Sequence, residues 1–427
     1  MYTLQEQIPI SFHLPAIFSL KLINVIRNSI DIIRKTLISP IHTFLKDSRA
    51  VGIVLIVCTI ASMVLANSAM QADYVGFWNN LFDPAGGHHY QYRSLHLPNS
   101  YLLWINDGMM VLFFFLVGME IKRELTVGEL SSFRKSILPV LAAIGGMLFP
   151  ALIFSLFNNN TPHSYGWGIP MATDIAFSLG ILSLLGKRVP VGLKIFLMAL
   201  AIIDDLGAIL TIAIFYTPHL DVKYLLIGGG VFLIPLLLNF LKVRRLIFYY
   251  IPGLVLWYCL FNSGVHATIA GVLLAFCIPQ EKIADLVHDL HDPVNFVIMP
   301  IFALANTAIQ LPSDIAGALH NNISYGVIAG LVLGKPLGIF ALSFLAVKLK
   351  LASLPSKAGW MQLIGVGLIA GIGFTMSIFI SSLAYAEREL QIIAIISVIA
   401  ASLIAGIAGF IFLRLLKPVG IVIVKQP

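Results

Sequence analysis

The residues best suited to chemistry in this sequence are three aspartates inside long apolar stretches. Asp174 lies near the centre of the stretch 166–186, and Asp204 and Asp205 lie near the centre of the stretch 191–216. A bilayer core is about 30 Å thick and a helix rises about 1.5 Å per residue, so these acids fall near the midplane. An unpaired charge there costs at least about 2.5 kcal/mol on insertion scales. We therefore expect the function of the protein to use them.

One basic side chain lies at a similar depth. Lys335, in the segment 334–338 (GKPLG), is at the middle of another apolar stretch. A lone lysine in lipid is costly when charged, so we expect Lys335 to balance a carboxylate or the end of an interrupted helix. A purely structural role and a role in carrying protons are both compatible with this position.

The chemistry available to these groups is exchange between ions. Neighbouring residues on a helix point about 100° apart, so Asp204 and Asp205 face different partners. Their hard oxygen atoms suit small hard cations, and no His and Cys cluster indicates a transition metal. Burial favours the neutral form of a carboxyl group, so protons and a metal cation compete for the same oxygens. The alternative is structural pairing of the aspartates with hydroxyl groups or with Lys335.

The composition defines a membrane protein. The chain has 427 residues, 59% hydrophobic and 11% charged, with a mean hydropathy of +0.93. Soluble domains contain about 25% charged residues, so one polytopic bundle explains the chain without a second soluble domain. The net charge of +7 does not indicate a nucleic-acid partner, because the basic residues lie at the ends of apolar stretches. Cys58, Cys259 and Cys277 lack ligand spacing and are expected to be small core hydrophobes.

The hydropathy pattern predicts an all-α bundle of about twelve transmembrane helices. They begin near Ala50, Tyr101, Ile137, Gly166, Gly192, Tyr224, Arg245, Ser263, Val294, Gly326, Gln362 and Gln391. The odd-numbered loops hold only Arg93, Lys223 and Arg388 of the basic residues, whereas nearly all others lie in the even-numbered loops or the tails. This bias predicts that both termini are cytoplasmic.

The predicted transmembrane domain spans residues 50–416, between a cytoplasmic N-terminal tail, 1–49, and a cytoplasmic C-terminal tail, 417–427. Within the first tail, 29–45 combines apolar residues with the charged and polar residues Asp31, Arg34, Lys35 and His42, as an interfacial helix does, and a poorly ordered tail is the alternative. The tail has no basic residue early enough for a signal peptide.

Two spans should be interrupted. Pro170 lies just before Asp174 and disfavours helix at the residue that precedes it. Glycines weaken the eleventh span within 365–373. If the third to fifth and the tenth to twelfth spans form two triples, each interrupted span is the second of its triple. This arrangement predicts an inverted repeat whose two broken helices cross at the midplane.

A short external β-hairpin is expected within 73–100. The Gly86-Gly87 turn signal precedes apolar residues at alternating positions, which is typical of a half-buried strand pair.

Other titratable residues lie near the ends of spans. Asp107 lies towards the outer end of the second span, and Glu120, Arg123 and Glu124 close that span at the inner face. Such a cluster is typical of a solvated helix end, and it is also suited to attracting ions or sensing protons.

Three histidines are further candidates. His266 begins the eighth span, where a packed core histidine is the usual role. His288 and His291 lie among acids at the inner start of the ninth span and would titrate near neutrality, which suits control of access. An ordinary polar helix start is the alternative.

Five passages together resemble the NhaA-type sodium/proton antiporter family, and the resemblance covers 44–416. They are 114–125 (FFLVGMEIKREL), 172–177 (ATDIAF), 201–207 (AIIDDLG), 334–338 (GKPLG) and 371–377 (GIGFTMS). The resemblance implies an electrogenic, pH-regulated antiporter without a cofactor. It would exchange cytoplasmic Na⁺, and also Li⁺, for external protons across a bacterial inner membrane. It also implies a homodimer to which the external hairpin contributes.

The resemblance also implies roles for individual residues. Cation and proton binding fall to Asp204, Asp205 and Thr173, with Asp205 the principal ligand, and Asp174 and Lys335 compensate the broken helices. The positions that match a pH response are Glu120, Arg123, Glu124, His266, His288 and His291. The sequence departs from the family at Val287, where related sequences often carry a glutamate.

Two other functions remain as alternatives. A sodium-coupled solute symporter would also need a buried cation site. An intramembrane aspartyl protease would need two carboxylates that share a proton, but a Gly-x-Gly-Asp arrangement is absent around both acids and Lys335 has no part in that chemistry.

Overall fold

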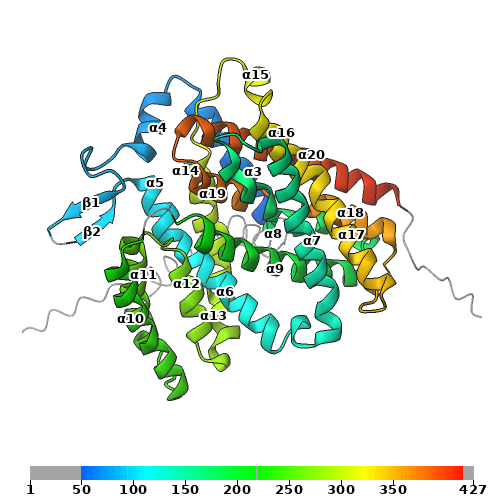
Figure 1. Cartoon of the computed structure of the whole chain (residues 1–427), viewed down its shortest axis with the longest axis horizontal. Coiled ribbons are helices and arrows are strands. Elements are labelled where there is room, and N and C mark those ends of the chain that lie inside the picture. The colour runs from blue at the N-terminus through cyan, green and yellow to red at the C-terminus, as the bar shows by residue number, and fades with distance from the viewer. Residues whose placement is uncertain (1–49, 94, 218–219, 357, 417–427) are drawn as a thin grey trace, which may run out of the picture.

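The computed structural model describes residues 50–93, 95–217, 220–356 and 358–416, which form a predominantly helical bundle (Figure 1). The two predicted tails, including the predicted interfacial helix 29–45, lie outside the described residues. In the first half of the chain the α-helices are α3 (Ala50–Ala66), α4 (Gln71–Asn79), α5 (Tyr101–Leu103), α6 (Met110–Thr126), α7 (Phe133–Asn158), α8 (Ile175–Leu184) and α9 (Val191–Phe215).

The second half contains more helices, several of them short. Its α-helices are α10 (Val222–Phe240), α11 (Ile247–Ser263), α12 (Ile269–Cys277), α13 (Gln280–Pro293), α14 (Met299–Asn306), α15 (Ile315–Leu319), α16 (Asn322–Ala329), α17 (Lys335–Lys348), α18 (Trp360–Ala370), α19 (Phe374–Ala384) and α20 (Arg388–Leu415). The π-helical turns are η2 (Trp104–Met109), η6 (Val294–Ile298) and η7 (Gly330–Gly334), and the 3-10 segments are η3 (Glu129–Ser131), η4 (Ser164–Met171) and η5 (Gly186–Arg188).

The described helices include many that could cross a membrane. By length and composition, seven helical stretches qualify, and nine qualify if each of two bent helix pairs counts as one span. The seven are Tyr101–Thr126, Ser136–Asn158, Ser164–Leu184, Val191–Phe215, Val222–Phe240, Asn322–Lys348 and Arg388–Leu415. This confirms a polytopic all-α membrane protein, whereas the count of twelve remains a prediction.

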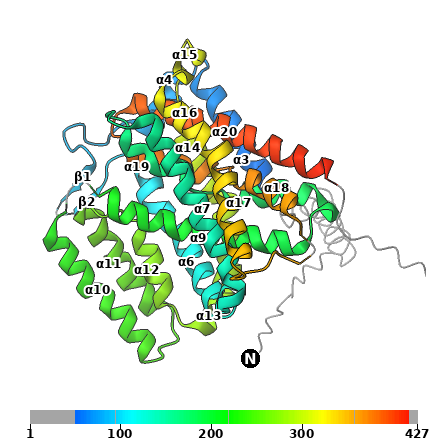
Figure 2. The same cartoon turned by 45° about the vertical axis from the view of Figure 1, so that its right-hand side comes forward.

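The sequence is apolar almost throughout because helices at the centre of the bundle and helices at its edge both carry mainly apolar side chains. Helix α9, which carries Asp204 and Asp205, is central: 67% of its most apolar window is buried. Helix α10 lies at the edge beside α11, and only 11% of its window is buried (Figure 2). Its exposed side chains are large and apolar, including Leu226 and Phe240. A surface of this kind is stable against lipid rather than water.

A β-hairpin lies at one end of the bundle, as the sequence predicts. Strands β1 (His89–Tyr92) and β2 (Leu95–Pro98) pair antiparallel, with Tyr90 opposite Leu97. Gly87 before β1 has a φ of +57°, a conformation that favours glycine. We call the end of the bundle that carries this hairpin the hairpin side (Figure 1). Helix α5 begins shortly after β2, so the chain enters the bundle again from this side.

Both predicted interruptions are present, and the two breaks touch. The first span consists of η4, the extended residues 172–174 and α8. In the second, α18 and α19 meet at a bend of 48° at residues 371–373. The backbone N–H of Asp174 donates to the carbonyl of Ile372 over 2.7 Å, so the unwound segments cross in direct contact.

Helices α7 and α17 pack closely beside this crossing. A Cβ atom built on Gly145 would lie 2.1 Å from the carbonyl oxygen of Gly338, and one built on Gly338 would lie 2.0 Å from that of Gly145. Such an approach of two backbones needs glycine on both sides. Because α17 begins with Lys335, this contact fixes the depth at which the lysine enters the bundle.

Gly145→Ala should therefore lower the stability of the protein. We expect a loss of about 1–3 kcal/mol because the added methyl group forces α7 and α17 apart. The matched control is Gly229→Ala in α10, where nothing lies within 4 Å of the added atom. The control should be neutral or gain up to about 1 kcal/mol from helix propensity. Thermal unfolding in detergent measures both, and equal midpoints would contradict the packing argument.

Candidate functional site

The carboxylate of Asp174 caps two helices at once. Its Oδ1 accepts the backbone N–H of Phe177 over 3.0 Å at the start of α8, and its Oδ2 accepts the backbone N–H of Thr375 over 3.1 Å at the start of α19. The hydroxyl group of Thr375 also donates to Oδ2. A helix N-terminus carries unpaired N–H groups and a partial positive charge, and one carboxylate satisfies both ends here.

Lys335 occupies the complementary position at a helix C-terminus. Its Nζ donates to the carbonyl of Met171, the last residue of η4, and lies 2.8 Å from Oδ2 of Asp204. Both Lys335 and Asp204 are fully buried. The ammonium group therefore joins the end of a half-helix to the aspartate of α9.

Hydroxyl groups complete the crossing. Thr173 donates from Oγ1 to Oδ2 of Asp204 over 2.7 Å and lies 3.0 Å from the carbonyl of Ala370 at the end of α18. Ser178 donates to the carbonyl of Ile369 over 3.1 Å. Ser178 of the other interrupted span thus pairs a carbonyl at the end of α18, as a helix end in lipid requires.

Asp205 differs from the other acids. It is 1% exposed and lines a cavity of about 170 Å³ together with Asp174, Glu120 and His291. Within the part of the chain that the structure describes, its Oδ1 has no hydrogen-bond partner, and neither has Oδ1 of Asp204. Buried acceptors without partners are costly unless a cation or a proton occupies them.

The structure thus brings together five of the residues singled out in the sequence: Thr173, Asp174, Asp204, Asp205 and Lys335. The candidates for pH response do not form one cluster. Glu120 and His291 line the cavity of Asp205, whereas Arg123 and Glu124 lie farther along α6, 3.8 Å apart as an ion pair.

The remaining histidines lie elsewhere. His288 is exposed on α13. Val287, where related sequences often carry a glutamate, is buried, and an apolar side chain suits that environment. His266 lies 3.6 Å from Asp107 near the hairpin side and does not line the cavity of Asp205. Of the three cysteines predicted to be core residues, Cys259 and Cys277 are buried, and Cys58 is half-buried and packs against the core.

Two features escaped the sequence analysis. Thr375 was part of a recognised passage, but nothing in its spacing indicated that it shares Asp174 with another helix. The contact of His88 with Asp107, at 3.9 Å, joins a loop to a span and has no signature in the sequence.

The arrangement can exchange ions without covalent chemistry. Three carboxyl groups and one amine share the crossing, so their charges do not balance when all are ionised. A small cation or protons can supply the difference at the carboxylate oxygens. Among the described residues, no group of three or more His, Cys, Asp or Glu is placed to hold a metal ion.

Interrupted membrane helices that cross beside buried ionisable groups are the architecture of a secondary ion transporter. The family Na+/H+ antiporter 1 matches residues 42–413. An Na(+)/H(+) antiporter NhaA 2 of Flavobacterium johnsoniae is 51% identical over 380 residues, which cover 87% of this chain and 91% of the relative. The chain therefore belongs to the Na+/H+ antiporter 1 family.

Relatives from other bacteria have similar identities. The Na(+)/H(+) antiporter NhaA of Cytophaga hutchinsonii is 47% identical over 87% of this chain and 94% of its own length. The Na(+)/H(+) antiporter NhaA 1 of Clostridium beijerinckii is 47% identical over 90% of this chain and 97% of its own length.

The double cap at Asp174 predicts an unusually large loss of stability on its removal. Asp174→Ala leaves two helix starts uncapped, at about 0.5–2 kcal/mol each. Asp221→Ala is the matched control, because Asp221 caps α10 alone. Thermal unfolding in detergent should show roughly twice the destabilisation for Asp174→Ala, and Asp174→Asn should lie between wild type and Asp174→Ala. Equal losses for the two alanine variants would contradict the double cap.

Proposed function

We propose that the protein exchanges cytoplasmic Na⁺, and also Li⁺, for external protons at Asp204 and Asp205. The observation that supports this most is the pair of buried carboxylate oxygens that have no hydrogen-bond partner among the described residues, beside the ammonium group of Lys335. The names of the family and of its relatives, which are Na(+)/H(+) antiporters, agree with this exchange. They give no support to a solute symporter or to a protease.

The contacts support a division of labour at the site. Asp205 has an oxygen free for a cation and faces the cavity, so it is the principal ligand. Asp204 and Thr173 supply further oxygens. When Na⁺ leaves, protons take its place on the carboxyl groups, because the buried site does not tolerate several unpaired negative charges. More than one titrating group permits more than one proton per cation, which makes the exchange electrogenic.

Lys335 and Asp174 serve the proposed exchange mainly by compensating the helix ends. Lys335 is also in direct contact with Asp204, so a change of charge on that aspartate alters the balance at the lysine. If Lys335 releases a proton when Na⁺ binds, that proton adds to the number of protons exchanged per Na⁺.

We propose an inner-membrane location with the hairpin side outside. The excess of Lys and Arg in the even-numbered loops supports this orientation and cytoplasmic termini. The cavity of Asp205 then extends towards the cytoplasmic end of α6, where Glu120 and His291 line it. In this proposal 50–416 is the transport domain, with twelve spans and an inverted repeat around the two interrupted helices.

The pH response and the homodimer belong to the same proposal. Glu120 and His291 line the path to Asp205, and Arg123, Glu124 and His288 lie on the adjoining helices at that end. His266 would act from the hairpin side. The β-hairpin is suited to pairing with a second copy of the chain, because each edge of a two-stranded sheet is open.

The decisive experiment is transport by reconstituted protein. An imposed Na⁺ or Li⁺ gradient should move protons the opposite way in proteoliposomes, and Asp205→Asn should abolish this movement because the site loses its principal charge. Asp289→Asn, on the polar face of α13, is the matched control and should retain exchange. Proton movement that ignores both cations would reject the proposal.

Competition for the same oxygens predicts a specific dependence on pH. The Na⁺ concentration for half-maximal exchange should rise as the pH on that side falls, by about tenfold per pH unit where one proton competes. Thr173→Val should weaken apparent Na⁺ affinity, because Asp204 loses a hydroxyl partner, while the competition with protons remains. An Na⁺ affinity independent of pH would show that the two ions bind at separate places.

A further inference from the structure

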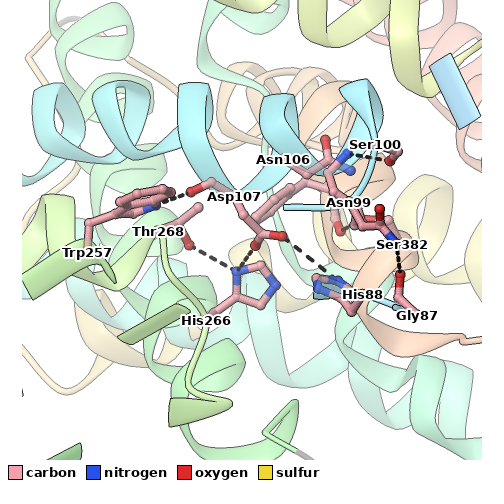
Figure 3. Close-up of polar contacts among 12 residues, drawn as sticks. Gly87, His88, Asn99, Ser100, Asn106, Asp107, Trp257, His266, Thr268 and Ser382 are labelled. Atoms are coloured by element: carbon pink, nitrogen blue, oxygen red, sulfur yellow. Dashed lines mark hydrogen bonds and ion pairs between the residues drawn. The ribbon is translucent and has the colours of Figure 1, made fainter. Parts of the chain in front are cut away.

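Asp107 lies at the centre of a second ionisable group, away from the crossing (Figure 3). Its Oδ1 is 3.6 Å from Nδ1 of His266, and its Oδ2 is 3.9 Å from Nε2 of His88. The indole N–H of Trp257 donates to the backbone carbonyl of Asp107 over 2.6 Å, and Oγ1 of Thr268 lies 3.3 Å from Nδ1 of His266. The carboxylate therefore lies between histidines from two separate parts of the chain, and Trp257 holds the backbone of the same residue.

This group connects the interior of the bundle with the solvent. The side chain of His88 is 56% exposed, whereas Asp107 and His266 are largely buried. Burial and the neighbouring His89 lower the pKa of His88 below its usual value. Within the described chain, the ion pairs of Asp107 are with His88 and His266. Two more histidines lie nearby, because His89 follows His88 in the chain and its ring centroid lies 6.2 Å from that of His96.

An aromatic layer separates this group from the candidate site. Helix α19 places Thr375 and Met376 in the lining of the Asp205 cavity, and Phe379 lies one turn farther along. The ring centroid of Phe379 is 5.5 Å from that of His266. It is also 5.4 Å from the ring of Phe114 in α6 and 6.1 Å from the ring of Phe302 in α14.

The aromatic layer is tightly packed. Phe114, Phe302 and Phe379 are each at most 1% exposed, and the cavity of Asp205 is lined by none of them. Ions do not cross a packed apolar layer of this kind unless it opens, since hydrophobic constrictions gate by excluding water. Ionisable groups thus face the layer from both sides, with Asp205 on one and His266 with Asp107 on the other.

We propose that Asp107, held between His88 and His266, is an external proton station of the transporter, and that the layer around Phe379 is the gate between this station and Asp205. In this state the gate is closed and the site opens to the opposite side. When the gate opens, protons held by the Asp107 carboxyl group reach Asp205 through the opened layer. The station rests on the proposed function, whereas the gate can be tested without any transport.

The structure also supplies a means of opening. Asp107 lies on the π-helical turn η2, which interrupts the span that carries Phe114. Such a turn marks a point where a helix can change its register, so movement of Asp107 and movement of Phe114 are coupled through one span. Asn106 of the same turn forms reciprocal side-chain hydrogen bonds of 3.2 and 2.9 Å with Asn306, at the end of the helix that carries Phe302.

The gate is tested by labelling a cysteine at Met376 in a variant whose three native cysteines are replaced by serine. A membrane-impermeant thiol reagent on the hairpin side should label Met376→Cys slowly, and adding Phe379→Ala should speed this labelling by about tenfold or more. Phe115→Ala is the matched control, because Phe115 is on the same helix as Phe114 but packs against Tyr250. If Phe379→Ala does not fold, Phe114→Ala takes its place. Equal labelling rates in the gate variant and the control would overturn the gate.

The station is tested by exchange in oriented proteoliposomes with the pH changed on one side at a time. Asp107→Asn should reduce the response to pH on the hairpin side by about threefold or more across the range in which histidine titrates. The response to pH on the other side should stay unchanged, and His88→Gln should reproduce part of the effect. Asp73→Asn removes an exposed carboxylate of α4 and is the control.

The outcomes separate the two proposals. If wild-type protein shows no cation-driven proton movement, the proposed function fails and the station fails with it, while the labelling result still decides the gate. If wild-type protein exchanges ions and Asp107→Asn behaves like Asp73→Asn, only the station is overturned.

Discussion

The constraint behind this structure is that a helix interrupted inside a membrane leaves unpaired backbone groups where no bulk water can reach them. Each break creates one end rich in N–H groups and one rich in carbonyls, and lipid satisfies neither. The two breaks cross, and Asp174 satisfies both N-terminal ends. Lys335 and Ser178 serve the two C-terminal ends. The ionisable groups are thus required by the fold before any ion is bound.

The charged residues at the crossing differ in how many structural contacts the fold requires of them. Asp174 and Lys335 are committed to backbone ends, and Asp204 is shared between Lys335 and Thr173. The Oδ1 of Asp205 has no hydrogen-bond partner in the part of the chain that the structure describes. The group with the fewest structural obligations is the one that can change partner at the lowest cost, because exchanging its ion leaves the helix caps intact. The same breaks that endanger the fold therefore create a site in which ion exchange and structural support fall on different residues.

The sequence predicted the parts of this arrangement that follow from local rules. Pro170 and the glycines at 371–373 break helices wherever they occur, and aspartates inside apolar stretches are visible from hydropathy alone. The sequence could not predict that Thr375 and Phe177 both donate to the carboxylate of Asp174. The contact with Thr375 depends on how two spans that are about 200 residues apart in the chain cross each other. Nor could the sequence pair Asp107 with a histidine from a loop, because loop position is set by tertiary packing.

The hairpin has a second consequence that its sequence pattern does not suggest. His88 directly precedes β1, and its ring contacts both Asp107 and the ring of Phe261. The amide group of Asn99, next to β2, donates to the carbonyl of Gly87 over 2.8 Å, which fixes the loop that presents His88 (Figure 3). A partner that bound the strand edges and shifted the hairpin would therefore also shift the imidazole next to Asp107. Association at the hairpin and access for protons from outside are thus mechanically linked, because one short loop carries both.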